Sequence, residues 1–415
     1  MPNLRPLLIA LLLTAMVAVG CSDPSENPQG QPDSDTTSEA TSEPDASTSP
    51  SPTPTGPRAE TIGLGLFPPI AHPGKQPAPS PGAPVVTATV KPASPGDTVL
   101  LQRRRSGGWK TVSREQQDDT GTVTFADVAQ PGGSAPVLYR AAVANPGGSG
   151  PVTSDSVDAA SWVTTFGEEF EGTSLDTAKW RYRQLDFYNP DGSRQCSKSD
   201  ESAVAVSAGT LKLQVRRDAQ RVGESCVTPE DGTHGYYLNG HVSTEETFTF
   251  THGVAAARVK FQRGRGQHGA FWMQHDEDTT AVAGQPFVSG AEVDVAEFFG
   301  EGYPDGGLSS FVYYLNDQNE NEKVGGIWPR ATRQLPPGDA WWRSYHVFSV
   351  EWTPQEYVVR VDGREIFRTS EGVSGVEQFL ILSLLSSDWE LDRLDESTLP
   401  STMQVDWVRV WQRPQ

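Results

Sequence analysis

The stretch Ala-Glu-Val-Asp-Val-Ala-Glu-Phe-Phe (291–299) combines an apolar, β-rich run with three acidic residues. Alternate residues of a strand share a face, so Glu292 and Asp294 point the same way and the valines between and after them point the other way. Glu297 has the opposite parity, and a β-bulge at Val295–Ala296 would bring it onto the face of the other two. The stretch therefore predicts a strand whose three carboxylates line one groove.

The β pattern extends outward from this strand over residues 161–415. Similar runs recur without a long helical period, at residues 209–216, 253–261, 346–352, 356–367, 379–385 and 404–411. Asp362-Gly363 separates two of these runs, and this dipeptide is a strong hairpin-turn signal. About 250 residues of strands predict one large all-β sandwich as the C-terminal domain.

Residues 81–160 carry a second β pattern of shorter runs, separated by Pro-Gly and Gly-Gly turns. Short strands at a spacing of roughly 8–12 residues predict a small sandwich. The segment resembles an immunoglobulin-like or fibronectin-type-III module. It contains no catalytic constellation, so a passive spacer is favoured over a carbohydrate-binding module.

The N-terminus has the features of an export signal. Residues 7–19 are apolar but too short to span a bilayer as a mature helix. The small residues before Cys21 resemble a bacterial lipobox, which predicts a signal peptide over 1–20 and a lipid on Cys21 that anchors the protein to the cell surface. Free secretion is the alternative. Residues 21–80 are rich in Ser, Thr, Pro, Asp and Glu or in Pro alone, and they predict a disordered tether and linker.

Charge and cysteine content narrow the class of protein. The formal net charge is −20, and eight acidic residues against one basic residue fall in 22–60. Phosphate binding needs clustered Lys and Arg, so nucleic acid is excluded as a partner. With Cys21 lipidated, Cys196 and Cys226 remain; an oxidising compartment predicts a disulfide between them, and two cysteines are too few for a zinc site. A monomer is expected.

The order of motifs over about 165–412 resembles glycoside hydrolase family sixteen, the laminarinase-like retaining β-glycanases. The acidic strand matches the family signature Glu-[Ile/Leu/Val]-Asp-x-x-Glu. Other matching stretches lie in the family's order, namely Phe-Gly-Glu-Glu-Phe-Glu-Gly (166–172), Gly-Ala-Phe-Trp-Met (269–273), His-Val-Phe-Ser-Val-Glu-Trp (346–352) and Val-Asp-Trp-Val-Arg-Val-Trp (405–411). The resemblance implies a jelly-roll sandwich with Glu292 as nucleophile, Asp294 as its assistant and Glu297 as acid/base.

The spacing of these carboxylates permits that chemistry. With one residue absorbed by a bulge, Glu292 and Glu297 are about 13 Å apart at Cα. Two leaning side chains can bring the carboxyls to about 5 Å, the retaining geometry, although the larger inverting separation is reachable as well. Asp294 between them can hold a shared proton and shift the pKa values of its neighbours apart.

Two departures from the family bear on specificity. His268 stands where family members commonly have a sugar-stacking Trp, and Ser-Ser-Phe-Val-Tyr-Tyr (309–314) has Val312 or Tyr313 where many laminarinases have a His. The candidate substrate-binding residues are Trp272, His268, Tyr237 and Trp389. His346 and Trp352 are interpreted as structural. Asp406 matches a position near a structural calcium in some family members; a surface carboxylate is the alternative.

The sequence thus favours an endo-acting retaining β-glycanase on β-1,3- or mixed-linkage glucan that needs no cofactor beyond that calcium. A carbohydrate-binding protein on the same fold, without turnover, is the alternative from another class. The presence of all three acidic residues argues against it. A third interpretation keeps the enzyme and changes the polymer to a galactan or another cell-wall glycan.

Overall fold

The computed structural model describes residues 59–74, 80–81, 83–125, 137–144, 150–158, 162–183, 188, 193–228, 232–276 and 279–414. They belong to a compact unit, Gly56–Gln415. The expected signal peptide (1–20), Cys21 and the tether up to residue 58 lie outside the described residues. In the part of the chain that is described, no helix is long and apolar enough to cross a membrane.

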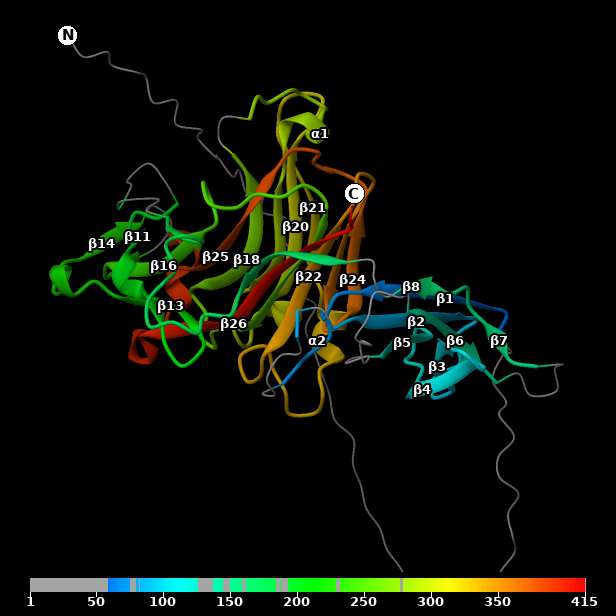
Figure 1. Cartoon of the computed structure of the whole chain (residues 1–415). Coiled ribbons are helices and arrows are strands. Elements are labelled where there is room, and N and C mark those ends of the chain that lie inside the picture. Colours follow the sequence, from blue (N-terminus) through cyan, green and yellow to red (C-terminus); the bar gives the residue numbers. More distant parts are fainter. Residues whose placement is uncertain are drawn as a thin grey trace, which may run out of the picture. The chain divides into compact units, whose positions relative to one another are not determined.

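The N-terminal β region consists of two small sheets (Figure 1). Side chains of both sheets form one hydrophobic core. The first sheet has the order β1-β2-β5, with strands Thr61–Phe67, Val85–Lys91 and Thr122–Phe125. The second has the order β4-β3-β6-β7 with β8 paired to β6; its strands are β3 Thr98–Arg105, β4 Gly108–Gln116, β6 Leu138–Val143, β7 Val152–Thr153 and β8 Val157–Asp158. An immunoglobulin-like topology for this region stays a prediction.

Strand β1 corrects the sequence-based boundary, because Thr61–Phe67 was expected to be linker. It pairs antiparallel with β2 over its whole length. The side chains of Ile62 and Leu66 are buried in the core of the small sandwich, which offsets the entropy of ordering the strand. The prolines that suggested a linker begin only at Pro68, after the strand has ended.

The C-terminal region forms one sheet of sixteen strands within the described residues. Its main path is β21-β20-β19-β18-β25-β16-β13-β26-β17-β22-β23-β24. In that order the strands are Asn321–Ile327, Leu308–Leu315, Glu292–Phe298, His268–His275, Gln378–Leu385, Tyr237–Ser243, Leu211–Arg217, Ser401–Gln412, Gly253–Lys260, His346–Trp352, Tyr357–Val361 and Arg364–Thr369. Short strands at its margins are β9 Val163–Glu168, β10 Arg181–Tyr182, β11 Ser197–Ser199 and β12 Val204–Val206; β14 Cys226–Thr228 and β15 Gly232–His234 form a separate hairpin.

This sheet folds over on itself into two layers around a single core, which confirms the expected jelly-roll sandwich. Alternation in the sequence builds each layer: in β13, Leu211, Leu213 and Val215 are buried and the residues between them are partly exposed. Phe298 of one layer packs against Phe261, which follows β17 of the other, with ring centroids 5.6 Å apart. Strands β21, β20, β18 and β25 lie together around β19, in the order β21-β20-β19-β18-β25 (Figure 1).

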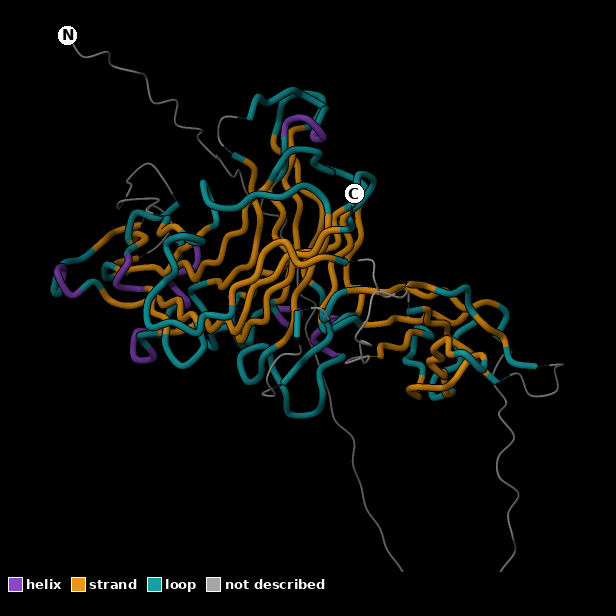
Figure 2. Tube along the Cα trace, in the orientation of Figure 1, coloured by secondary structure: helices purple, strands orange, loops and turns teal. Residues whose placement is uncertain are grey.

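Helices are short and connect strands (Figure 2). The α-helices are α1 Pro286–Ser289 and α2 Pro329–Arg333. The 3₁₀ helices are η1 Glu201–Ala203, η2 Ala219–Arg221, η3 Pro304–Gly306, η4 Asp388–Arg393 and η5 Glu396–Thr398. The expected disulfide is confirmed: Cys196 and Cys226 are bonded, with Cα atoms 5.5 Å apart.

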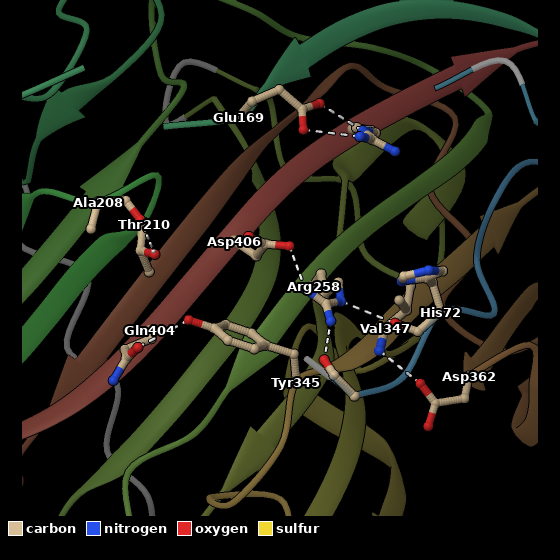
Figure 3. A network of polar contacts seen from close by, with 12 residues as sticks. His72, Glu169, Ala208, Thr210, Arg258, Tyr345, Val347, Asp362, Gln404 and Asp406 are labelled. Carbon is tan, nitrogen blue, oxygen red and sulfur yellow. Dashed lines mark hydrogen bonds and ion pairs between the residues drawn. The ribbon is translucent and has the colours of Figure 1, made fainter. Parts of the chain in front are cut away.

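The described residues between 67 and 85 (67–74, 80–81 and 83–85) pack on the outer face of the jelly roll, and we call them the strap. Phe67, Ile70 and Val85 share a hydrophobic cluster with residues of β17, β22 and β26. Arg258 of β17 is buried beneath the strap and donates hydrogen bonds to the backbone carbonyls of His72 and Gly74 (Figure 3). The prolines of this segment suggested a linker, but its described residues are packed against the jelly roll.

Candidate active site

The β-bulge expected in the acidic strand is present and sits where the parity argument required it. Ala296 pairs with Phe271 of β18 while Asp294 pairs with the next residue, Trp272, so Val295 has no partner on that side. On the other side the register shifts between Asp294 and Glu297. The hydroxyl of Ser310 donates a hydrogen bond to the carbonyl of Val295 at 2.8 Å, which satisfies the backbone group that the bulge frees.

The bulge places the three acidic side chains on one face of the sheet. Glu297 pairs with Ala270, and Asp294 pairs with Trp272, two residues further along β18. Residues two apart in a strand share a face, so Glu297, Asp294 and Glu292 form a single row. We call this row the acidic face.

Burial and the charges of nearby carboxylates raise the pKa values of all three carboxyls. Burial is the main cause in each case. For Glu292, burial and the charge of Glu297 raise the pKa to about 7. Asp294 is 6 % exposed, and burial together with both neighbouring carboxylates holds its pKa well above the ordinary value. The pKa of Glu297 is also raised, by burial and by the charge of Glu390.

The surroundings of the outer two carboxyls differ. The positive charges of Arg183 and Arg194 favour the ionised form of Glu292. Gln274 donates a hydrogen bond to Glu292 at 3.3 Å, and its amide oxygen accepts from Arg183 at the same distance. For Glu297 the main opposing influences are the charge of His268 and a 3.4 Å hydrogen bond from the Ser309 hydroxyl. Sequence reasoning missed both arginines, because neither lies in the motif.

Trp272 lies on the acidic face, as expected for a sugar platform. Its indole N–H donates to the hydroxyl of Ser383 at 3.1 Å. Its ring stacks with that of His241, with centroids 6.0 Å apart. These contacts hold the indole beside the carboxyl row with its side chain partly exposed.

His268 and Trp389 lie together beside the acidic face. Their rings stack with centroids 5.8 Å apart and an interplanar angle of 20°. Trp389 is 44 % exposed, whereas His268 is 7 % exposed. His268 Nδ1 lies 2.7 Å from Glu390 Oε1, a partner that the sequence did not suggest because it lies 122 residues away.

Tyr237 does not join this group, which corrects its assignment as a substrate contact. Its ring is 1 % exposed and packs in the main core together with both disulfide cysteines. Its hydroxyl donates to Glu396. A strand pattern alone does not distinguish a platform aromatic from a core aromatic at the end of a strand. His346 and Trp352 are buried, as their structural interpretation required.

Val312 and Tyr313, the two residues expected where many laminarinases have a His, lie on opposite faces of β20. Tyr313 of β20 pairs with Glu292 across the sheet, and Val312 points into the core. Burial and the three nearby carboxylates raise the pKa of Tyr313, so its hydroxyl is a neutral donor at neutral pH.

Asp406 of β26 forms an ion pair with Arg258 of β17 (Figure 3). Among the described residues no group of three His, Cys, Asp or Glu side chains could hold a metal ion. The guanidinium next to Asp406 disfavours a second cation there. The calcium site stays a prediction without support from this geometry.

Comparison with known proteins identifies the large domain. The family model of glycosyl hydrolases family 16 matches residues 192–409. Glucan endo-1,3-beta-glucosidase A1 of Niallia circulans is 26 % identical over 59 % of this chain and 37 % of its own length. Keratan-sulfate endo-1,4-beta-galactosidase of Sphingobacterium multivorum is 27 % identical over 58 % of this chain and 57 % of its own length. The chain thus spans well under two thirds of these two relatives.

A beta-glucanase of Rhodothermus marinus is 24 % identical over 62 % of this chain and 88 % of its own length. Among solved structures, endo-beta-1,3-glucanase from Pyrococcus furiosus is similar with a TM-score of 0.48 and 22 % identity, covering 62 % of this chain and 97 % of that one.

Proposed function

This chain belongs to glycosyl hydrolases family 16, and from that membership we propose that it is an extracellular, endo-acting, retaining hydrolase of a β-linked glucan. The observation that carries the proposal is the acidic face, three buried carboxyls brought into one row by a bulge. Their surroundings differ, and two catalytic carboxyls with different surroundings can take different roles in glycoside hydrolysis.

Glu292 is the proposed nucleophile. Arg183 and Arg194 favour its ionised form, and the hydrogen bond from Gln274 orients it. In the first step its carboxylate forms a bond to the anomeric carbon of the sugar while the bond from that carbon to the glycosidic oxygen breaks.

Glu297 is the proposed acid/base. Its raised pKa keeps a proton available for the departing glycosidic oxygen. After the leaving sugar departs, the Glu297 carboxylate takes a proton from water, which attacks the anomeric carbon and releases Glu292. Asp294 lies between them, and its raised pKa allows it to donate a shared proton to a neighbouring carboxylate.

The proposed substrate is a β-1,3- or mixed-linkage glucan. Two relatives named glucosidase or glucanase support this choice. Trp272 and Trp389 are the proposed sugar platforms, with His268 beside them. A galactan is the second candidate, because one relative is named an endo-1,4-beta-galactosidase and because His268 and Tyr313 depart from the laminarinase pattern.

An extracellular location with a lipid on Cys21 is part of the proposal. It rests on the N-terminal sequence and on the Cys196–Cys226 disulfide, since disulfides persist in oxidising compartments. Free secretion is the alternative, and globomycin-sensitive processing of the N-terminus in a bacterial host distinguishes the two.

A reducing-sugar assay of the full chain on a panel of polysaccharides tests the activity. Turnover of laminarin or mixed-linkage glucan that is lost in Glu292→Gln supports the proposal. Turnover of galactans alone selects the second polymer. Binding without turnover on every glycan contradicts the enzymatic proposal and favours a carbohydrate-binding protein.

A further inference from the structure

A buried His–Glu pair lies beside the acidic face. His268 begins β18 and Glu390 lies in η4, and their side chains are 10 % and 6 % exposed. His268 Nδ1 lies 2.7 Å from Glu390 Oε1, which also accepts the backbone N–H of Ser387 at 2.9 Å. A carboxylate held by two donors fixes the imidazole in one orientation.

The register of the sheet places His268 next to Glu297. Ala270 pairs with Glu297, and His268 is two residues before Ala270 on the same face. His268 is therefore a diagonal cross-strand neighbour of Glu297, a relation in which Cβ atoms are about 7–8 Å apart. Its ring also lies 5.8 Å from that of Phe299, centroid to centroid.

Two opposing charges of the pair act on Glu297. The charge of His268 lowers the pKa of Glu297, and that of Glu390 raises it. In the other direction, burial lowers the pKa of His268, whereas Glu390 and Glu297 raise it, and the pKa lies above its usual value. Among the described residues, further charged or titratable groups near this site include Glu292 and Asp294 of β19, Tyr313 of β20, Lys323 of β21, His241 of β16, and Arg183 and Arg194 from loops.

We propose that His268 and Glu390 are a positioning pair for the acid/base carboxyl: Glu390 holds a protonated imidazole beside Glu297, where its positive charge offsets the negative charge of the row. The inference rests on the proposed function for the role of Glu297. It assigns to His268 an electrostatic task in place of the sugar-stacking task of the Trp that family members commonly have there.

The pH profile of kcat/KM on the polysaccharide that the enzyme turns over tests the pair. The alkaline limb of this profile reports the loss of the proton from Glu297. His268→Gln removes the positive charge and leaves Glu390 ionised, so the alkaline limb moves up by about one pH unit. Glu390→Gln removes the carboxylate that keeps the buried imidazole protonated, so both charges are lost together and the alkaline limb stays close to the wild-type position. The double variant also lacks both charges and is expected to have the same alkaline limb.

The control is a His–carboxylate pair distant in sequence from the acidic strand. His346 Nδ1 lies 2.8 Å from Asp362 Oδ2, and His346 is fully buried. His346→Gln alters folding stability and leaves the alkaline limb in place. Lower activity in His268→Gln with an unmoved limb shows that the pair only supports the structure, and it overturns the inference.

A measurement without turnover separates this inference from the proposed function. By linkage, the pKa of His268, read from its imidazole C–H resonance in NMR, falls in Glu297→Gln by as much as that of Glu297 rises in His268→Gln. The resonance is assigned by its loss in His268→Gln among the seven histidines. An unchanged His268 pKa in Glu297→Gln overturns the inference even if no polysaccharide is cleaved.

Discussion

Replacing the proposed nucleophile, Glu292→Gln, is expected to stabilise the fold at alkaline pH. Burial and Glu297 raise the pKa of Glu292 from 4.5 to about 7. Between these values the folded state binds more protons than the unfolded state, so stability falls as pH rises through this window. At 1.36 kcal/mol per unit the full shift corresponds to about 3 kcal/mol at pH 8. Glutamine carries no charge and still accepts the hydrogen bond from Gln274.

The assay is urea unfolding followed by tryptophan fluorescence, compared between wild type and Glu292→Gln at several pH values. The variant is expected to be more stable by up to about 3 kcal/mol at pH 8, and the difference disappears near pH 4, where both side chains are neutral. A gain in stability together with a loss of activity is the trade-off expected when a catalytic residue is replaced.

A matched control is Glu351→Gln. Glu351 forms an ion pair with Arg360 at 3.0 Å, and the Arg360 side chain is 7 % exposed. Neutralising this partner leaves a buried cation unpaired, so the control is expected to be less stable. A Glu292→Gln variant that is less stable than wild type, or whose advantage does not depend on pH, refutes the electrostatic account of the acidic face.

The sequence predicted those parts of the site that follow from local parity. The wrong parity of Glu297 required a bulge at Val295–Ala296, and the structure has it there. With Cys21 assigned to the lipid, only Cys196 and Cys226 remained to form a disulfide, and the structure has that disulfide. Both inferences depend on few residues and little tertiary context.

The incorrect predictions concern residues whose role depends on tertiary contacts that the local sequence does not show. Strand β1 was missed because prolines after Phe67 dominate the composition of its window. Tyr237 was assigned to the substrate because strand alternation does not distinguish core from open face near a strand end. Glu390 was missed because nothing local marks an isolated acidic residue as the partner of a distant histidine.

Three further changes test other parts of the account. Arg258→Met leaves Asp406 and the carbonyls of the strap without their buried partner, and it is expected to lower the free energy of unfolding by about 3–5 kcal/mol in thermal unfolding. Arg343→Met, at an exposed site, is expected to leave the free energy of unfolding unchanged. Equal stability of the two variants would argue against a packed strap. Trp389→Ala is expected to raise KM roughly tenfold, because it removes a partly exposed indole beside the acidic row. Val222→Ala, at an exposed site, is expected to have no effect, and an unchanged KM in Trp389→Ala would remove Trp389 from the substrate contacts. Replacing both Cys196 and Cys226 by Ser removes a disulfide between residues separated by 30 positions in the sequence. The free energy of unfolding measured with urea is expected to fall by about 3–4 kcal/mol. Full stability of the double variant would contradict a structural role for the disulfide.

The central claim, that Glu292 attacks the sugar with Glu297 as acid/base, is tested most directly by trapping the covalent intermediate. The full chain is incubated with an activated 2-deoxy-2-fluoro-β-glucoside whose glycan matches the substrate found in the polysaccharide assay, digested, and analysed by tandem mass spectrometry. The account predicts a glycosyl ester on Glu292 and first-formed products of retained configuration. A label on Glu297, or turnover with inversion and no label, would contradict it.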